Sequence, residues 1–376
     1  MQQQNKNSEF EGFCYSGERF ADLQMLRYRL NGFESLSLRQ KLYVYYLSKA
    51  TLAGRDITTD QFGFYNLDIR KVLEAVYVNY QGNKECEDFI AMTIYLKRIW
   101  FSNGIYHHYG SEKFAPEFSP AFLLDAMKSI EPSLLPLAKG ETVDGLFDRL
   151  KSAIFDPSFL PKKVNKADGC DLVATSACNF YHNVSQHEVE DYYSSLKATV
   201  DKNPPSFGLN SRLVKQNGEL IEQVWKIDGM YSKAIEIIVS YLRQAAEYAE
   251  NEQQQKIISL LISYYQTGDL RVFDKYSIEW LKEQDGRIDF INGFIEVYND
   301  PLGLKASWEG IVEYKDLVAT RRTRTISDNA QWFEDNSPVD SRFKKKIVKG
   351  VTANVVCAAM LGGDETVHLQ QLQRWR

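Results

Sequence analysis

The chain has 376 residues, of which 45 are Lys or Arg and 50 are Asp or Glu, so its formal net charge is -5. A protein that binds a phosphate backbone needs a basic field, and this balance therefore argues against nucleic acid as a partner. Apolar residues make up 44% of the chain and charged residues 25%, as in ordinary folded proteins. At roughly 150 residues per domain, the length predicts two or three domains or one bilobed unit.

The sequence shows no targeting segment and no membrane span. Its N-terminus, MQQQNKNS, lacks a basic stretch followed by an apolar one, and no run of 18 apolar residues occurs. None of the cysteines forms a Cys-x-x-Cys pair that would indicate a zinc ribbon or a disulfide scaffold. We therefore expect a cytoplasmic protein with free thiols and without a membrane partner.

The first two hundred residues are predicted to be mostly helical. Apolar residues at three- and four-residue steps predict a helix over residues 65–80, with Asn66 where a cap would stand. Residues 101–120 are rich in Gly, Ser, Pro and aromatic residues, which favours a loop. Ser185 and Glu188 have the spacing of a capping box, so a helix should begin there.

A hairpin is predicted in the middle of the chain. Asn217-Gly218 separates two β-prone runs, residues 209–214 and 220–227. Asn and Gly tolerate the positive φ angles that a two-residue hairpin turn requires at both positions. Two antiparallel strands are not stable alone, so they should join a larger sheet.

Helical patterns return after the hairpin. Apolar stripes cover residues 235–246 and 257–265, and a further helix is expected over residues 270–282. The basic stretch 315–324 contains three arginines, which we interpret as a solvated helix face because the whole chain is acidic.

A metal site is not apparent, because histidine is scarce. The five histidines are His107, His108, His182, His187 and His368. A helical zinc protease motif needs two histidines one turn apart with a glutamate between them, but the fourth residue after His187 is Asp191. The adjacent pair His107-His108 would need a loop conformation and further ligands to hold a metal. Nucleophile elbows and glycine-rich phosphate loops are also absent from the sequence.

Residues 293–310 form the most unusual segment. If they alternate as in a strand, Phe294, Glu296 and Tyr298 lie on one face, and Glu309 follows near a second strand. A carboxylate and a phenol on one strand face can hold an ammonium and an amide together. The simpler alternative is a surface carboxylate beside a half-buried tyrosine.

Three pieces of the sequence together resemble a known family. They are residues 203–213 (NPPSFGLNSRL), residues 284–298 (QDGRIDFINGFIEVY) and Asp300-Pro301. The chain is similar, from about Phe20 to Asp364, to the N-terminal part of the dipeptidyl-peptidase III family, peptidase family M49, and to its bacterial branch. These zinc exopeptidases remove dipeptides from the N-termini of short peptides.

The resemblance implies an α+β, predominantly helical fold with two lobes. The lower lobe would contain a small five-stranded antiparallel β-barrel that includes the hairpin and the Glu296 strand, and the second, helical lobe would carry zinc. The peptide would bind between the lobes as an added strand. The expected division is a flexible N-terminus at 1–19, a mainly helical part of the lower lobe at 20–200, its barrel part at 201–314, the start of the upper lobe at 315–360, and a tail unlike the family at 361–376.

The resemblance also implies roles for four residues. Glu296 corresponds to the carboxylate that pairs with the free α-ammonium of a short peptide. Tyr298 corresponds to a catalytic tyrosine whose hydroxyl supports the oxyanion near the scissile carbonyl. Glu309 corresponds to a second cleft carboxylate, and Tyr109 to an aromatic residue that contacts the N-terminal side of the peptide.

The zinc motif of the family does not occur in the 376 residues. Neither His-Glu-x-x-Gly-His nor the later Glu-Glu-x-Arg-Ala-Glu is present, and the resemblance stops after Asp364. We therefore expect a truncated or frame-shifted dipeptidyl-peptidase III-like chain. Zinc would belong to the intact family enzyme, with no metal ligands and no bound zinc in this chain. Two alternatives are a non-catalytic peptide-binding module and an unstable product.

Overall fold

The computed structural model describes residues 12–200, 202–350 and 354–363. The expectations for the first 11 residues and for the tail beyond Gly363, including His368, lie outside these residues. The chain divides into two compact units, one formed by residues up to Arg29 and Tyr65–Lys163, the other by Leu30–Phe64 and most of the chain after Val164.

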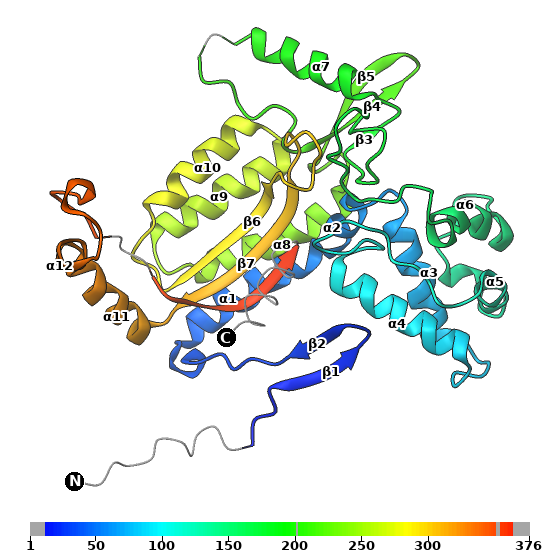
Figure 1. Ribbon diagram of the computed structural model, residues 1–376, viewed down its shortest axis with the longest axis horizontal. Coiled ribbons are helices and arrows are strands. Elements are labelled where there is room, and N and C mark those ends of the chain that lie inside the picture. The colour runs from blue at the N-terminus through cyan, green and yellow to red at the C-terminus, as the bar shows by residue number, and fades with distance from the viewer. Residues whose placement is uncertain (1–11, 201, 351–353, 364–376) are drawn as a thin grey trace. The chain divides into compact units, whose positions relative to one another are not determined.

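The first unit combines a short hairpin with helices α3 to α6 (Figure 1). Its elements are β1 (Ser16–Phe20), β2 (Leu23–Leu26), α3 (Asn66–Asn79), α4 (Glu87–Ser102), α5 (Pro120–Lys128) and α6 (Val143–Phe155). Helix α3 confirms the helix expected at 65–80, but Asn66 is its first residue and not its cap. Instead, the Asn66 side chain accepts a hydrogen bond from the backbone N–H of Ile105, at 3.3 Å. The loop expected at residues 101–120 is present, although its first two residues still belong to α4, and it ends at Ser119, which caps α5.

The second unit contains the two larger sheets of the described chain. Its helices are α1 (Leu38–Ala53), α2 (Arg55–Gln61), α7 (Gln186–Ala198), α8 (Ser232–Tyr248), α9 (Glu252–Thr267), α10 (Leu270–Lys282), α11 (Leu317–Asp328) and α12 (Ala330–Asn336). Its strands are β3 (Tyr181–His182), β4 (Ser211–Gln216), β5 (Glu219–Val224), β6 (Ile288–Glu296), β7 (Ser307–Lys315) and β8 (Val356–Gly363). Short 3-10 turns lie at Phe33–Ser35, Pro132–Leu134 and Ser341–Phe343, the second of them in the first unit.

The predicted hairpin is confirmed. Strands β4 and β5 are antiparallel, and Gln216 pairs with Glu219, which leaves Asn217 and Gly218 as the two turn residues. Their φ angles are 52° and 86°, as this tight turn requires. The sheet is completed by β3, which pairs with β4 in parallel, so its order is β3-β4-β5.

A second antiparallel sheet has the order β6-β7-β8 (Figure 1). The hairpin and the Glu296 strand therefore belong to different sheets among the described strands, and no closed barrel is seen within them. The α+β, mostly helical class is confirmed, whereas the barrel stays a prediction.

One face of the β6-β7-β8 sheet is packed against helices. Phe294 and Trp308 form a cross-strand pair, and both are fully buried. The indole N–H of Trp308 donates to the Tyr265 hydroxyl of α9 at 3.1 Å, and that hydroxyl donates to Asn292 at 2.6 Å. Buried aromatic and aliphatic residues of α1, α8 and α9 continue this core.

Helix α10 covers the outer edge of β6. The indole N–H of Trp280 donates to the backbone carbonyl of Phe290 at 3.1 Å, and the phenol oxygen of Tyr276 accepts a hydrogen bond from the backbone of Asn292. Side chains of α10 therefore satisfy backbone groups that an edge strand would otherwise present to another chain.

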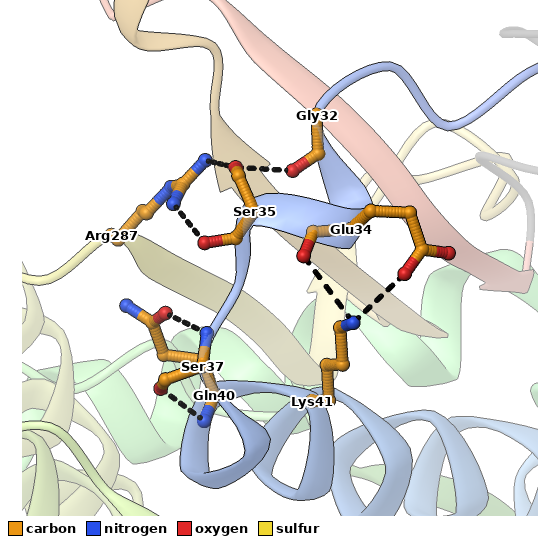
Figure 2. Close-up of polar contacts among 7 residues, drawn as sticks. All are labelled: Gly32, Glu34, Ser35, Ser37, Gln40, Lys41 and Arg287. Atoms are coloured by element: carbon orange, nitrogen blue, oxygen red, sulfur yellow. Dashed lines mark hydrogen bonds and ion pairs between the residues drawn. The ribbon is translucent and has the colours of Figure 1, made fainter.

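Polar contacts join the start of α1 to the start of β6 (Figure 2). Ser37 and Gln40 form a capping box at the N-terminus of α1. Arg287, the residue before β6, donates to the Ser35 hydroxyl at 2.8 Å, and Lys41 forms an ion pair with Glu34 at 3.0 Å. The Arg287–Ser35 contact joins residues that are 252 positions apart in the sequence, whereas the capping box and the ion pair are local.

The remaining helical predictions agree with the structure. Ser185 and Glu188 form the expected capping box of α7, and α10 has the predicted bounds. Arg321, Arg322 and Arg324 are exposed on α11, as expected for a solvated basic face. None of the described helices combines the length and apolar character needed to cross a bilayer.

Candidate functional site

Glu296 lies at the end of β6, where the pairing with β7 is irregular. Phe294 pairs with Trp308, but the next pair joins Glu296 to Ser307, so Ile295 is an extra residue in the strand. Such a bulge changes the face on which the following side chain lies. Glu296 therefore does not share the face of Phe294, and the predicted alternation is wrong at this point.

The bulge brings Glu296 to the face of Glu309. Glu309 is two residues after Ser307 on β7, and it pairs with Gly293 on β6. Because residues two apart on a strand lie on the same face, Ser307 and Glu309 share a face, and Glu296 joins them through its pairing with Ser307. Diagonal neighbours of this kind are typically about 7–8 Å apart, so two carboxylates occupy one small region of the sheet.

Glycines flank Glu309 on both neighbouring strands. It pairs with Gly293 of β6 and with Gly363 of β8. A Cβ on Gly363 would lie 2.8 Å from the Cα of Glu309 and 2.3 Å from the carbonyl oxygen of Trp308, and its φ is +80°. A side chain at position 363 would therefore collide with β7, the strand that carries Glu309. Glu309 itself is 2% exposed.

Tyr298 lies outside β6, in the turn that follows it. Its side chain is 40% exposed, whereas the neighbouring Asn299 and Asp300 are buried. The position of the phenol is thus set by the connector between β6 and β7, residues 297–306, and not by the strand ladder.

The connector is held by buried polar groups whose structural role the sequence did not indicate. The Asp300 carboxylate accepts hydrogen bonds from the backbone N–H groups of Leu302, Leu304 and Lys305 at 3.2, 2.8 and 2.8 Å. It also accepts from the Tyr181 hydroxyl at 2.8 Å. Burial raises the pKa of Asp300, and these hydrogen bonds oppose the rise. In the sequence, Asp300-Pro301 was notable only as one of the pieces that resemble the family.

Tyr109 belongs to the first unit and is 54% exposed in the loop after α4. Its backbone N–H donates to Nδ1 of His107 at 3.2 Å, and that of Gly110 donates to the same atom at 3.0 Å. The rings of His107 and His108 stack in this loop with centroids 4.3 Å apart, and Nδ1 of His107 is already occupied by the two backbone donors. The structure brings Glu296 and Glu309 together on one face of a sheet in the second unit. Tyr109 belongs to the first unit.

The described residues do not fit a zinc ion. Within residues 12–200, 202–350 and 354–363, no three His, Cys, Asp or Glu side chains are grouped so that they could hold a metal. The nearest approach to a metal motif, His187-Glu188, is part of the α7 capping box, and Glu188 also binds Lys215. We derive no chemical step through zinc for this chain.

Comparisons with known proteins find similarity to peptidase family M49 and to several dipeptidyl peptidases 3. The model of "Peptidase family M49" matches residues 177–350. Dipeptidyl peptidase 3 of Dictyostelium discoideum is 23% identical over 344 residues, 85% of this chain and 48% of that protein. The human dipeptidyl peptidase 3 is 21% identical over 353 residues, 83% of this chain and 46% of its own length.

Solved structures show the same fold. The structure of dipeptidyl-peptidase III from Caldithrix abyssi superposes with a TM-score of 0.60 at 18% identity, covering 89% of this chain and 51% of that one. The enzyme from Corallococcus sp. strain EGB gives a TM-score of 0.56 at 16% identity, covering 90% and 50%. The matches support a relationship to the dipeptidyl-peptidase III family, peptidase family M49. It spans about half the length of the relatives that it matches.

Proposed function

We propose that this chain binds short peptides by their free N-terminus, as the peptide-holding part of a dipeptidyl-peptidase III-type exopeptidase. The observation that carries the proposal is the β6 bulge, which puts Glu296 on the same face as Glu309. Two carboxylates within one small region attract a single ammonium group more strongly than one exposed carboxylate would. The family relationship of residues 177–350 supports the choice of a peptide as the ligand.

Glu296 is the residue that we assign to the α-ammonium. It is half-buried at the end of a strand, so its carboxylate meets solvent while its backbone stays fixed in the ladder. An internal segment of a longer peptide has no ammonium to offer, and it would leave a partly desolvated carboxylate without its partner. This contact would therefore select peptide ends over peptide interiors.

Glu309, Tyr298 and Tyr109 are assigned supporting roles. Glu309 adds negative potential on the same face, and the Tyr298 hydroxyl would donate to a peptide carbonyl near the second residue. Tyr109 would offer an exposed ring to the N-terminal side of the peptide. An added strand needs a free strand edge, and because α10 covers that of β6, the edge of β8 is the one available among the described strands of this sheet.

Hydrolysis is a separate question from binding. The 376 residues contain no His-Glu-x-x-Gly-His sequence, which supplies zinc ligands and the general base in the family that the chain resembles. We therefore propose that this polypeptide, by itself, holds a peptide without cleaving it.

Titration calorimetry with one tetrapeptide in two forms tests the proposal. The free peptide and its N-acetylated form differ only in the ammonium group. We expect the free form to bind at least 10-fold more tightly, because a charge-assisted hydrogen bond contributes about 1.5–3 kcal/mol. Equal affinities would refute the ammonium assignment, and no binding of either form would refute peptide binding.

A further inference from the structure

Lys305, in the connector between β6 and β7, is completely enclosed. None of its surface is exposed, and its ammonium donates three hydrogen bonds. The acceptors are the Tyr193 hydroxyl at 2.6 Å, the Gly208 carbonyl at 3.2 Å and the Ser211 hydroxyl at 3.3 Å. An ammonium has three N–H donors, so this arrangement satisfies it fully.

Glu222 closes the network from the other side. The hydroxyls of Tyr193 and Ser211 donate to the same carboxylate oxygen of Glu222, at 2.7 and 2.6 Å. Each hydroxyl thus accepts a hydrogen bond from Lys305 and donates one to Glu222. The network links α7, β4, β5 and the connector, and it places opposite charges at its two ends.

The connector is attached to the β3-β4-β5 sheet at a second point. Asp300, which is 1% exposed, accepts from the Tyr181 hydroxyl of β3 at 2.8 Å. Leu302 and Leu304 pack against the small core that Tyr193 and its neighbours form. The backbone is fixed as well, since the N–H of Ala306 donates to the Leu209 carbonyl at 2.9 Å.

We propose that Lys305 and Asp300 are positioning residues, which act through the connector to hold the Tyr298 phenol in place relative to Glu296. The reason is geometric. Tyr298 lies beyond the last ladder pair of β6, so the sheet fixes Glu296 but not Tyr298. The next anchored residues along the chain are Asn299, which donates to the Ser307 hydroxyl at 3.0 Å, and then Asp300 and Lys305, which attach the rest of the connector to the other sheet. The inference deepens the proposed function, because Tyr298 is the phenol assigned there to the peptide.

The position of Tyr298 should then depend on pH. Burial lowers the pKa of Lys305 to about 8, although Glu222 and Asp300 oppose the shift. The other groups that face the ammonium are the rings of Tyr181 and Tyr193, whose centroids lie 5.4 and 4.6 Å from it. Loss of the proton removes a donor from the network, so the connector should loosen as the pH rises through about 8.

A fluorine reporter at position 298 tests this without any peptide. Tyr298 is replaced by 4-trifluoromethylphenylalanine, which does not titrate, in the full 376-residue chain. We expect its ¹⁹F resonance to shift between pH 7 and 9.5 with a midpoint near 8. The shift should disappear in Lys305→Met and persist in Lys233→Met, which changes an exposed lysine of α8.

A milder variant covers the case in which Lys305→Met does not fold. Ser211→Ala removes one acceptor of the ammonium and keeps the charge, so the midpoint should move to lower pH. The inference is overturned if the resonance does not titrate in this range, or if it titrates equally in Lys305→Met. If Lys305→Met does not fold, an unchanged midpoint in Ser211→Ala overturns the inference instead.

Peptide titrations distinguish the positioning role of Lys305 from the proposed peptide binding. In a double-mutant cycle at pH 7, Lys305→Met and Tyr298→Phe should have non-additive effects on peptide affinity, because both act through one phenol. Additive effects would overturn the positioning role even if the fluorine signal responds. A chain that shows the fluorine titration but binds no peptide would refute the proposed function and leave the positioning inference standing.

Discussion

Glu296 pairs with Ser307, although continuation of the register from Phe294 and Trp308 would have given that place to Ile295. One extra residue thus decides which face of the sheet carries the carboxylate. Without it, Glu296 would lie on the face that contains the buried Phe294, where an ionised group without a partner is costly. The bulge is the structural reason that Glu296 and Glu309 can act on one ligand.

Replacing Glu296 by glutamine should remove the preference for a free N-terminus. Glutamine keeps the size of the side chain and loses the charge, so we expect free tetrapeptide to bind about 10- to 100-fold more weakly, while the acetylated form changes less than about 2-fold. Calorimetry at pH 7 measures both affinities. Glu247→Gln, an exposed glutamate of α8, is the matched control and should leave the affinities unchanged. If the affinities of both peptide forms fall equally in Glu296→Gln, the Glu296 carboxylate does not bind the peptide ammonium.

The purified polypeptide should release no dipeptide from a dipeptidyl arylamide. The expectation rests on the absence of the zinc-binding sequence of the family from the 376 residues. Elemental analysis should find less than about 0.1 zinc per chain after dialysis, since structural and catalytic sites retain zinc tightly. Turnover that a chelator abolishes and added zinc restores would contradict this prediction.

Glu313 should make the protein less stable as the pH rises from 4.5 to 7. Burial, followed by the charge of Asp289, raises the pKa of Glu313 from 4.5 to about 7, and the two residues pair directly across β6 and β7. Between these pH values the folded state keeps a proton on Glu313 that the unfolded state has lost. The free energy of unfolding therefore falls as the pH increases, and this decrease levels off above pH 7.

The matching variant is Glu313→Gln, which should be more stable than the parent at pH 7.5 by about 1 kcal/mol and similar to it at pH 4.5. Urea unfolding midpoints at both pH values measure the difference. An identical pH dependence in the parent and in Glu313→Gln would show that this residue is not responsible.

Gly54 should not tolerate even one methyl group. A Cβ at this position would lie 2.3 Å from the ring of Trp308, which is fully buried. We expect Gly54→Ala to destabilise the protein by about 1–3 kcal/mol through overpacking. Gly145→Ala in α6 is the control, because its nearest contact would be 3.4 Å. In a Trp308→Leu background the cost of Gly54→Ala should shrink, and an undiminished cost would exclude the clash as its cause.

The parts of the fold that depend on local chemistry could be predicted from the sequence. The β4-β5 turn follows from Asn217-Gly218, because few other residue pairs accept two positive φ angles. Helix α10 follows from its apolar period and from Asp269, whose side chain caps it by accepting from the N–H of Arg271. In both cases the residues that determine the structure lie within one turn of it.

The candidate site depended on distant partners and was only partly predictable. Glu296 and Glu309 could be named, but their common face results from a bulge in β6 that only its pairing with β7 reveals. Lys305 could not be recognised as buried, because its acceptors Tyr193 and Ser211 lie 112 and 94 residues earlier in the chain. A lysine is ordinarily exposed, and only this enclosing network makes its burial possible.

The cover that α10 provides for β6 has a consequence for how copies of this protein behave at high concentration. An uncovered edge strand is a template on which identical sheets join into fibrils. With Trp280 and Tyr276 bonded to the outward backbone groups of β6, that route of polymerisation is blocked on one side of the sheet. Removal of the Trp280 side chain would uncover this edge, and copies of the chain could then pair along β6.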